Sequence, residues 1–384
     1  MDLLIKIIFA VSLVMFAVPT MAADEDVETY VFADIEFDDN VFRVSGSEEA
    51  QEQLNESSQS DTIAIIGVGT KIRLPISRQQ LNIDAEINRI QYDRFDDLNS
   101  TNGRFHSEWE WVYGRSISGD VGYRFDRRVS DFFEPAGVEG DTVETQTLFS
   151  STTIPLHRRW DFVFGGNLVD QEFEERTQLD RETLQVYGEF LFRTRGKTFI
   201  GLGLVQTEGD FDTDQNSDFD QTDINLLVRR DISDKSRVSL SVGRSERDPD
   251  DPQSGEFSGT IWEADYRYGL SGKTFIDFRA FRETQLIVEV NNLVISQGID
   301  IEPQWRISPR LTLSGLIGFQ EREFEGGSNS SRDDDLTRLR TNVNYRLSRA
   351  LTLNFSLNYS TRDSNDENAE FDRTAARLGL RFTI

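Results

Sequence analysis

The sequence predicts an all-β fold, a transmembrane up-and-down antiparallel β-barrel of about 18 strands, within a range of 16–18. Three observations support this prediction. Apolar and polar residues alternate through long stretches of the chain, short basic turns alternate with long acidic loops, and an apolar stripe runs to the last residue. Together they are typical of barrels that cross a membrane with strands.

The alternation is clearest at 351–360, "LTLNFSLNYS", where Leu351 and Phe355 are apolar while Thr352 and Asn354 are polar. Only an extended strand places such residues on two separate faces. Stretches of the same kind occupy 81–88, 184–193, 236–242, 312–320 and 338–347. They are longer than the usual five or six residues of soluble strands. We expect the odd positions of 351–359 to face lipid and the even positions to face a polar lumen.

The connections predict two different rims. Short turns, nearly all of which carry Lys or Arg, occur at 75–79, 116–120, 155–159, 194–197, 233–236, 271–273, 308–310 and 348–350. Longer acidic loops occur at 38–61, 133–141, 209–220, 247–256, 325–335 and 362–370. The sequence therefore predicts short periplasmic turns, long extracellular loops, and both termini at the short-turn rim.

Aromatic residues near strand ends predict a girdle at the headgroup layer, where amphipathic rings are favoured. They are Trp109, Trp111, Tyr113, Trp160, Phe162, Trp262, Tyr266, Tyr268 and Trp305. The last strand, 373–384, carries Ala376, Leu378, Leu380, Phe382 and Ile384 on one face. Such a strand is a signal for the barrel-assembly machinery, although the usual terminal Phe is Ile384 here.

The N-terminus predicts a targeting segment. Residues 1–23 hold an apolar stretch, Pro19 and small residues before a cleavage point, as in a secretory signal peptide. An uncleaved membrane anchor is the alternative. The remaining residues, 24–384, form a single predicted barrel domain in the outer membrane of a Gram-negative bacterium, in contact with its lipid and lipopolysaccharide.

Composition excludes several classes of function. The 384 residues contain no cysteine, which rules out disulfides and thiolate metal sites. The net charge of −27 argues against nucleic acid as a partner. Catalysis is not expected, because His106 and Ser107 are strand neighbours that point to opposite faces. No cofactor is expected either.

The inward face of the predicted barrel carries both signs of charge. A barrel of about 18 strands is roughly 36 Å wide and leaves an aqueous channel. The candidates for contact with a solute are Arg229, Arg237, Arg338, Arg340, Arg346, Arg377, Arg381, Asp84, Glu86, Glu263 and Asp265. The C-terminal arginines are candidates for a track that guides an anionic polymer. The alternative is that these charges pair across strands and hydrate the wall.

The acidic loop 210–220 begins like a calcium loop, with Asp210, Asp212 and Asp214. The EF-hand pattern then requires Gly and Glu where this chain has Gln215 and Gln221. A solvated loop is therefore favoured over a metal site, with weak divalent bridging to lipopolysaccharide left open.

The stretches "DDNVFR" (38–43), "LPISRQQL" (74–81) and "WEWVYGRSISGDVGYRF" (109–125) resemble EpsL-type outer-membrane β-barrels. This group of β-barrel porins belongs to exopolysaccharide operons associated with exosortase systems. The resemblance covers the first third of the chain. It implies a role in exopolysaccharide biosynthesis and export, with periplasmic export components as partners, and it assigns no functional residue.

Two functions therefore stand at this point. The first is a hydrophilic channel that serves exopolysaccharide export. The alternative is a general or substrate-selective porin that admits small hydrophilic solutes.

Overall fold

A computed structural model describes residues 27–46, 58–130, 140–212, 218–251, 256–287, 292–325 and 331–384. The predicted signal peptide, 1–23, lies outside the described residues and stays a prediction. In the described part of the chain, no helix is both long enough and apolar enough to cross a membrane.

Eighteen antiparallel strands form one closed sheet, as the sequence predicted. They are β1 (Val27–Asp38), β2 (Asp61–Ile76), β3 (Gln79–Tyr92), β4 (Ser100–Tyr113), β5 (Ile117–Val129), β6 (Thr142–His157), β7 (Trp160–Phe173), β8 (Arg181–Arg193), β9 (Thr198–Phe211), β10 (Phe219–Ser233), β11 (Ser236–Pro249), β12 (Phe257–Gly269), β13 (Thr274–Ile287), β14 (Asn292–Ser308), β15 (Leu311–Glu325), β16 (Asp333–Arg346), β17 (Leu351–Ser364) and β18 (Phe371–Thr383).

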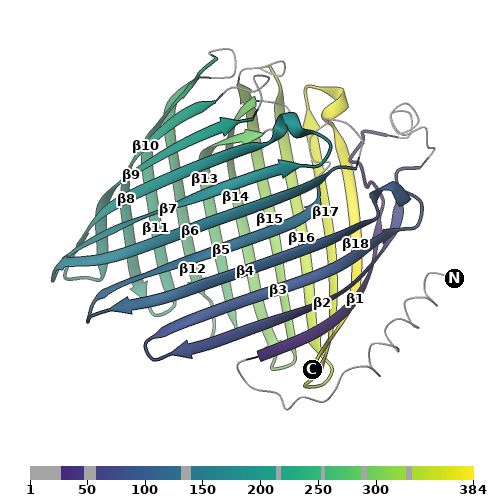
Figure 1. The fold of residues 1–384 in the computed structure, drawn as a ribbon, viewed down its shortest axis with the longest axis horizontal. Coiled ribbons are helices and arrows are strands. Elements are labelled where there is room, and N and C mark those ends of the chain that lie inside the picture. The colour runs from purple at the N-terminus through teal and green to yellow at the C-terminus, as the bar shows by residue number, and fades with distance from the viewer. Residues whose placement is uncertain are drawn as a thin grey trace.

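Each strand pairs with its neighbour in sequence, and β1 pairs with β18 to close the cylinder (Figure 1). The seam extends to the end of the chain, where Ile384 N donates to Thr29 O over 2.8 Å. Closure satisfies the backbone donors and acceptors that an open edge would leave unpaired in hydrocarbon.

The two faces of the sheet differ in chemistry as the alternation predicted. On β17, Phe355, Leu357 and Tyr359 are exposed on the outer surface, whereas Asn354 lines a hollow of the inner wall. The inner face is identified by contacts that skip a strand, such as Arg229 on β10 with Glu189 on β8. Midway along the strands, side chains two strands apart approach each other on the concave side of a barrel, where the curvature brings them together.

The two ends of the barrel carry different connections. One end, the short-turn rim, holds the turns 77–78, 114–116, 158–159, 194–197, 234–235, 270–273, 309–310 and 347–350, and each of them contains Lys or Arg. The other end, the loop rim, holds the longer connections. Among the described residues, three of these connections contain 3-10 helices, η1 (Asp96–Leu98), η2 (Thr177–Leu179) and η5 (Glu367–Ala369). The first residue of β1 and the last residue of β18 both lie at the short-turn rim (Figure 1).

Aromatic side chains gather on the outer surface beside the short-turn rim. Trp109 and Tyr113 precede the turn at 114–116, Trp160 follows the turn at 158–159, and Trp305 precedes the turn at 309–310. Trp160 also stacks on Phe190, with ring centroids 4.7 Å apart. Trp262 differs from these residues because it lies near the middle of β12.

Two small apolar clusters lie at the loop rim. Leu98 of η1 packs with Val41, Phe42 and Val44, at the start of the predicted loop 38–61. Leu179 of η2 packs with Val143 and Phe173. In both loops, therefore, a buried leucine on a 3-10 turn packs against apolar side chains at the loop rim. Residues 47–57 of the first loop lie outside the described residues.

Candidate functional site

The candidate site is the inner wall of the barrel, where the described residues line three hollows. The first, of about 390 Å³, is lined in part by Asp34, Glu86, Arg104, Arg377 and Arg381. The other two, of about 320 and 300 Å³, lie on the β10–β14 side and include Arg229, Arg237, Glu263 and Asp265. Seven of the predicted site residues therefore line hollows.

Glu86, on β3, is the centre of the first hollow. Its carboxylate accepts hydrogen bonds from the Tyr30 hydroxyl at 2.8 Å and from Arg104 Nη2 at 3.0 Å. Arg381 Nη2 lies 3.9 Å away and its guanidinium covers the Tyr30 ring. The Tyr30 ring fits this position because Gly69 opposite it has no side chain, and a Cβ there would lie 2.4 Å from the hydroxyl.

An ion-pair ladder crosses the closing seam. Arg373 Nη2 lies 2.6 Å from an Asp38 oxygen, and Arg377 Nε lies 3.2 Å from Asp34 and 3.5 Å from Glu36. The arginines come from one face of β18 and the acids from one face of β1, which the register places opposite each other. Two members of the predicted arginine track, Arg377 and Arg381, are thus engaged with acids of the wall.

Two of the other predicted arginines, Arg338 and Arg340, also have partners on the wall, whereas Arg346 lies at the rim. Arg338 Nη2 lies 3.2 Å from Asp300, and Arg340 Nε donates to Asn358 Oδ1 at 3.0 Å. Arg346 is the last residue of β16, and it is exposed at the short-turn rim. Arg338 and Arg340 are thus held by partners on different strands, and Arg346 lies apart from them at the rim.

Arg229 and Arg237 lie on the opposite side of the wall. Arg229 makes a two-pronged pair with Glu189, at 2.8 and 3.0 Å, and Arg237 Nε lies 2.7 Å from Asp231. Glu263 pairs with Arg279 at 3.1 Å. Of the predicted acids, Asp84 lies 3.7 Å from Lys71 and 3.8 Å from Arg104.

In the strand-skipping pairs, the arginine is more exposed than the acid. Side-chain exposure is 44% for Arg229 against 18% for Glu189, and 37% for Arg338 against 14% for Asp300. The long guanidinium side chains lie over the shorter carboxylates. A solute in the lumen therefore meets mostly guanidinium groups, although both charges are present in each pair.

Tyr30, Asp34 and Arg104 are parts of this wall that the sequence did not predict. Strand β1 contains luminal aromatic residues, so its inner face does not look polar in the sequence. Arg104 follows the alternation of Asn102 and His106 on β4, and this pattern was a signal that could have identified it.

His106 lies on the inner wall, where its Nδ1 accepts a hydrogen bond from Arg124 Nε at 3.0 Å. Its Nε2 lies 3.9 Å from Glu108. Ser107 alternates to the other face, opposite Tyr123. The two residues therefore do not approach each other, as the sequence indicated.

Several loop-rim aspartates cap backbone N–H groups. Asp61 accepts from Arg94 N and Phe95 N at 3.1 and 3.0 Å, and Asp141 accepts from Glu175 N at 2.9 Å. Asp180 accepts from Phe173 N at 2.6 Å. Part of the acidic composition of the loops thus replaces missing backbone partners.

The weak calcium candidate is only partly described. Asp210 and Asp212 lie at the end of β9, and Asp214 lies outside the described residues. Over the described part of the chain, no group of three or more His, Cys, Asp or Glu residues has the geometry of a metal site.

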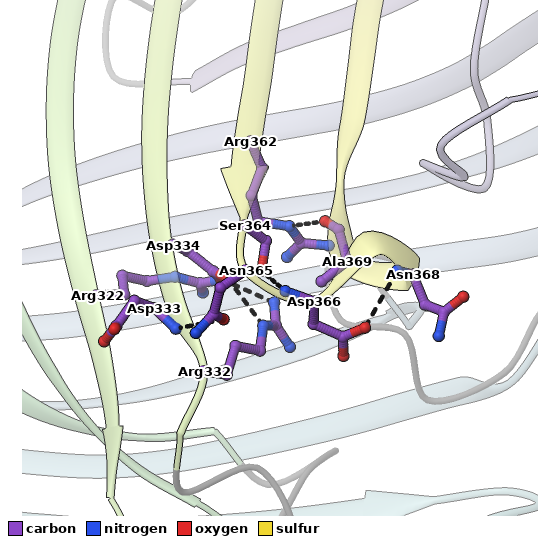
Figure 2. Close-up of polar contacts among 10 residues, drawn as sticks. All are labelled: Arg322, Arg332, Asp333, Asp334, Arg362, Ser364, Asn365, Asp366, Asn368 and Ala369. Carbon is purple, nitrogen blue, oxygen red and sulfur yellow. Dashed lines mark hydrogen bonds and ion pairs between the residues drawn. The ribbon is translucent and has the colours of Figure 1, made fainter.

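Buried arginines form a second polar cluster at the loop rim. Asp334 accepts from Arg322 at 2.5 Å and from Arg332 at 2.9 and 2.8 Å, as Figure 2 shows. Both guanidinium groups lie over the Phe324 ring, at 5.2 and 4.4 Å from its centroid. Arg362 donates to the carbonyl of Ala369 in η5.

The fold resembles several outer-membrane porins of known structure. OpdK from Pseudomonas aeruginosa, crystallised with vanillate, is 11% identical, with a TM-score of 0.51 over 94% of this chain and 99% of that chain. OccK2 (OpdF) from the same organism is 8% identical, with a TM-score of 0.52 over 94% and 98%. A BenF-like porin from Pseudomonas fluorescens Pf-5 is 10% identical, with a TM-score of 0.50 over 94% and 99%. At such identities the likeness concerns the fold alone.

The sequence comparisons are consistent with the fold. A search of curated proteins gave no match. The family described as "Putative beta-barrel porin 2" matches residues 165–384, more than half of the chain. This match does not include the three stretches that resemble the EpsL-type barrels, and the assignment to exosortase operons is not confirmed. The chain belongs to the "Putative beta-barrel porin 2" family and is a porin-like β-barrel of the outer membrane.

Proposed function

We propose that the barrel is a passive channel for small hydrophilic solutes and that it favours anionic over cationic ones. The observation that carries this proposal is the arrangement of the strand-skipping pairs, with arginine exposed and acid beneath. Guanidinium groups that face water attract carboxylates and donate hydrogen bonds to hydroxyl groups. The overall charge of −27 would by itself favour cations, so the lumen and the whole chain predict opposite selectivity.

Solute uptake into liposomes tests this proposal. Liposomes that contain the folded barrel should swell when they are diluted into isotonic glucose or sodium vanillate, and vanillate is chosen because the OpdK structure contains it. Empty liposomes are the control. No swelling with any small solute, from a preparation with the circular dichroism of a β-barrel, would contradict the proposal.

Exopolysaccharide export was the first expectation from the sequence, and the comparisons favour the alternative. A passage for small solutes needs only an open, polar lumen, whereas polymer export also needs a binding track along the barrel. Among the predicted arginines, Arg377 lies against Asp34 and Arg338 against Asp300, while Arg340 binds the Asn358 amide. Guanidinium groups engaged in this way favour a solute channel over a continuous polymer track. Deletion of the gene should leave the amount of secreted polysaccharide unchanged.

A further inference from the structure

Arg247 lies on the inner face of β11, close to the loop rim. Its side chain is buried, with 3% exposure. The guanidinium carbon lies 3.4 Å from the centre of the Phe219 ring, and the register places Phe257 directly opposite on β12. A cation is thus held against an aromatic ring inside the barrel.

Buried arginines elsewhere in this chain have acceptors. Four arginines are under 5% exposed among the described residues: Arg247, Arg322, Arg332 and Arg362. The last three bind the Asp334 carboxylate or the Ala369 carbonyl (Figure 2). Arg247 differs, because no oxygen of a described residue accepts a hydrogen bond from it, and its Nε is buried without a partner.

The nearby side chains do not neutralise Arg247. On β10, Gln221 lies opposite Arg247 and Asp223 lies opposite Ser245. The Asp223 carboxylate accepts a hydrogen bond from Gln221 Nε2 at 3.1 Å and makes no ion pair with Arg247. Arg181, at the loop end of β8, adds a second positive charge that acts on Arg247. The Phe219 ring offers cation–π attraction, which is much weaker than the cost of burying an unpaired charge.

A second polar group on the same face also has no partner. Ser245 lies two residues before Arg247, on the same side of β11, and its side chain is fully buried. Its hydroxyl makes no hydrogen bond with a described residue. Residues two apart on a strand are about 7 Å apart, so one small ligand can reach both groups.

We propose that Arg247 and Ser245 form a binding site for a small oxyanion, a carboxylate or a phosphate group. The planar guanidinium donates two parallel hydrogen bonds to either group, and the hydroxyl donates a third. The anion supplies the negative charge that the described residues do not. This site does not depend on the proposed channel function, because an anion can bind in a barrel that conducts nothing.

Calorimetric titration of the purified full-length barrel in detergent tests the site. Acetate and inorganic phosphate are titrated separately, at matched ionic strength, and the arm that gives heat identifies the group. Wild type should bind one equivalent of acetate or of phosphate. Arg247→Gln should weaken binding by at least about tenfold, the effect of losing charge-assisted hydrogen bonds.

Arg244→Gln is the matched control, because Arg244 lies on the same strand, is exposed, and pairs with Glu246 at 3.1 Å. It should bind like wild type. If Arg247→Gln does not fold, Arg247→Lys serves in its place. Lysine keeps the positive charge but cannot donate two parallel hydrogen bonds, so this variant should bind the anion more weakly than wild type. Equal binding by all variants, or no binding of acetate or phosphate, overturns the proposal. A carboxylate of the chain within 4 Å of Arg247 in an experimental structure would overturn it as well.

Discussion

Arg229 and Glu189 form a two-pronged ion pair across strand β9, with nitrogen-to-oxygen distances of 2.8 and 3.0 Å. The arginine side chain is 44% exposed and the glutamate side chain 18%. The pair therefore presents its positive member to the lumen.

Ion selectivity should respond to this pair in both directions. Arg229→Gln removes the exposed charge and leaves the carboxylate, so the reversal potential in a salt gradient should move toward cation selectivity. Glu189→Gln should move it toward anions. Arg230→Gln is the control, because Arg230 is the next residue on β10 and points to the other face. Equal shifts for Arg229→Gln and Arg230→Gln would mean that the wall does not set the selectivity.

The ladder across the seam should contribute to the stability of the closed barrel. Arg377→Glu places a third acid beside Asp34 and Glu36, and should lower the free energy of unfolding by about 1–2 kcal/mol, a modest value because Arg377 is partly exposed. Denaturant unfolding in detergent measures this change. Arg346→Glu, at the exposed end of β16, should have a smaller effect. The idea fails if the two variants unfold alike.

Asp180 should make stability depend on pH. Burial, together with Asp212, Asp141 and Asp170, raises the pKa of this carboxyl above its ordinary value of 3.8, although the Phe173 N–H opposes the rise. The folded state therefore binds the proton more tightly than the unfolded state. Ionisation of Asp180 therefore lowers the free energy of unfolding. This loss is absent below pH 3.8, grows as the pH rises toward the raised pKa, and is constant above that pKa.

Asp180→Asn tests this dependence, since Asn99 makes the same bond to Tyr92 N at 2.8 Å in the η1 loop. At neutral pH the variant should be at least as stable as wild type, and the difference should vanish below pH 3.8. Asp180→Ala should instead lose roughly 1–3 kcal/mol, because the Phe173 N–H loses its acceptor. A pH-independent difference between wild type and Asp180→Asn would contradict this account.

Asn40 should hold the start of the first loop in place. Its amide donates to Val44 O at 2.8 Å and to Asp372 O at 2.9 Å, and its oxygen accepts from Val44 N at 3.1 Å. Asn40→Ala should speed proteolysis near residue 44 several-fold. Asn40→Asp keeps the acceptor but loses both donors, so it should be cut at an intermediate rate. Equal cleavage of all three proteins would show that this anchor is unimportant.

The sequence was sufficient for the architecture because alternation is a local property. Residues 351–360 reveal both faces of β17 without knowledge of any neighbour. The turns at 194–197 and 271–273 were found in the same way, from residues adjacent in the chain. The local signal fails on β1, where Tyr30 and Phe32 are luminal because Gly69 and Gly67 lie opposite them.

The wall itself was less predictable, because its pairs depend on register. Arg377 and Asp34 lie at opposite ends of the sequence and meet only when β18 pairs with β1. The sequence left open whether Arg377 and Arg381 guide a polymer or pair across strands, because the register that decides between these possibilities is not a local property. Arg247 shows the opposite case, since its lack of an acceptor is visible only after its neighbours have been placed.

Conductance of the purified barrel in a planar lipid bilayer tests the central claim most directly. The account predicts stepwise current increases as barrels insert, and a reversal potential that shows preference for anions in a potassium chloride gradient. A silent bilayer, with insertion demonstrated by protease protection of the strands, would contradict an open lumen. Open channels with clear cation preference would contradict the assignment of the arginine-lined wall as the selective element.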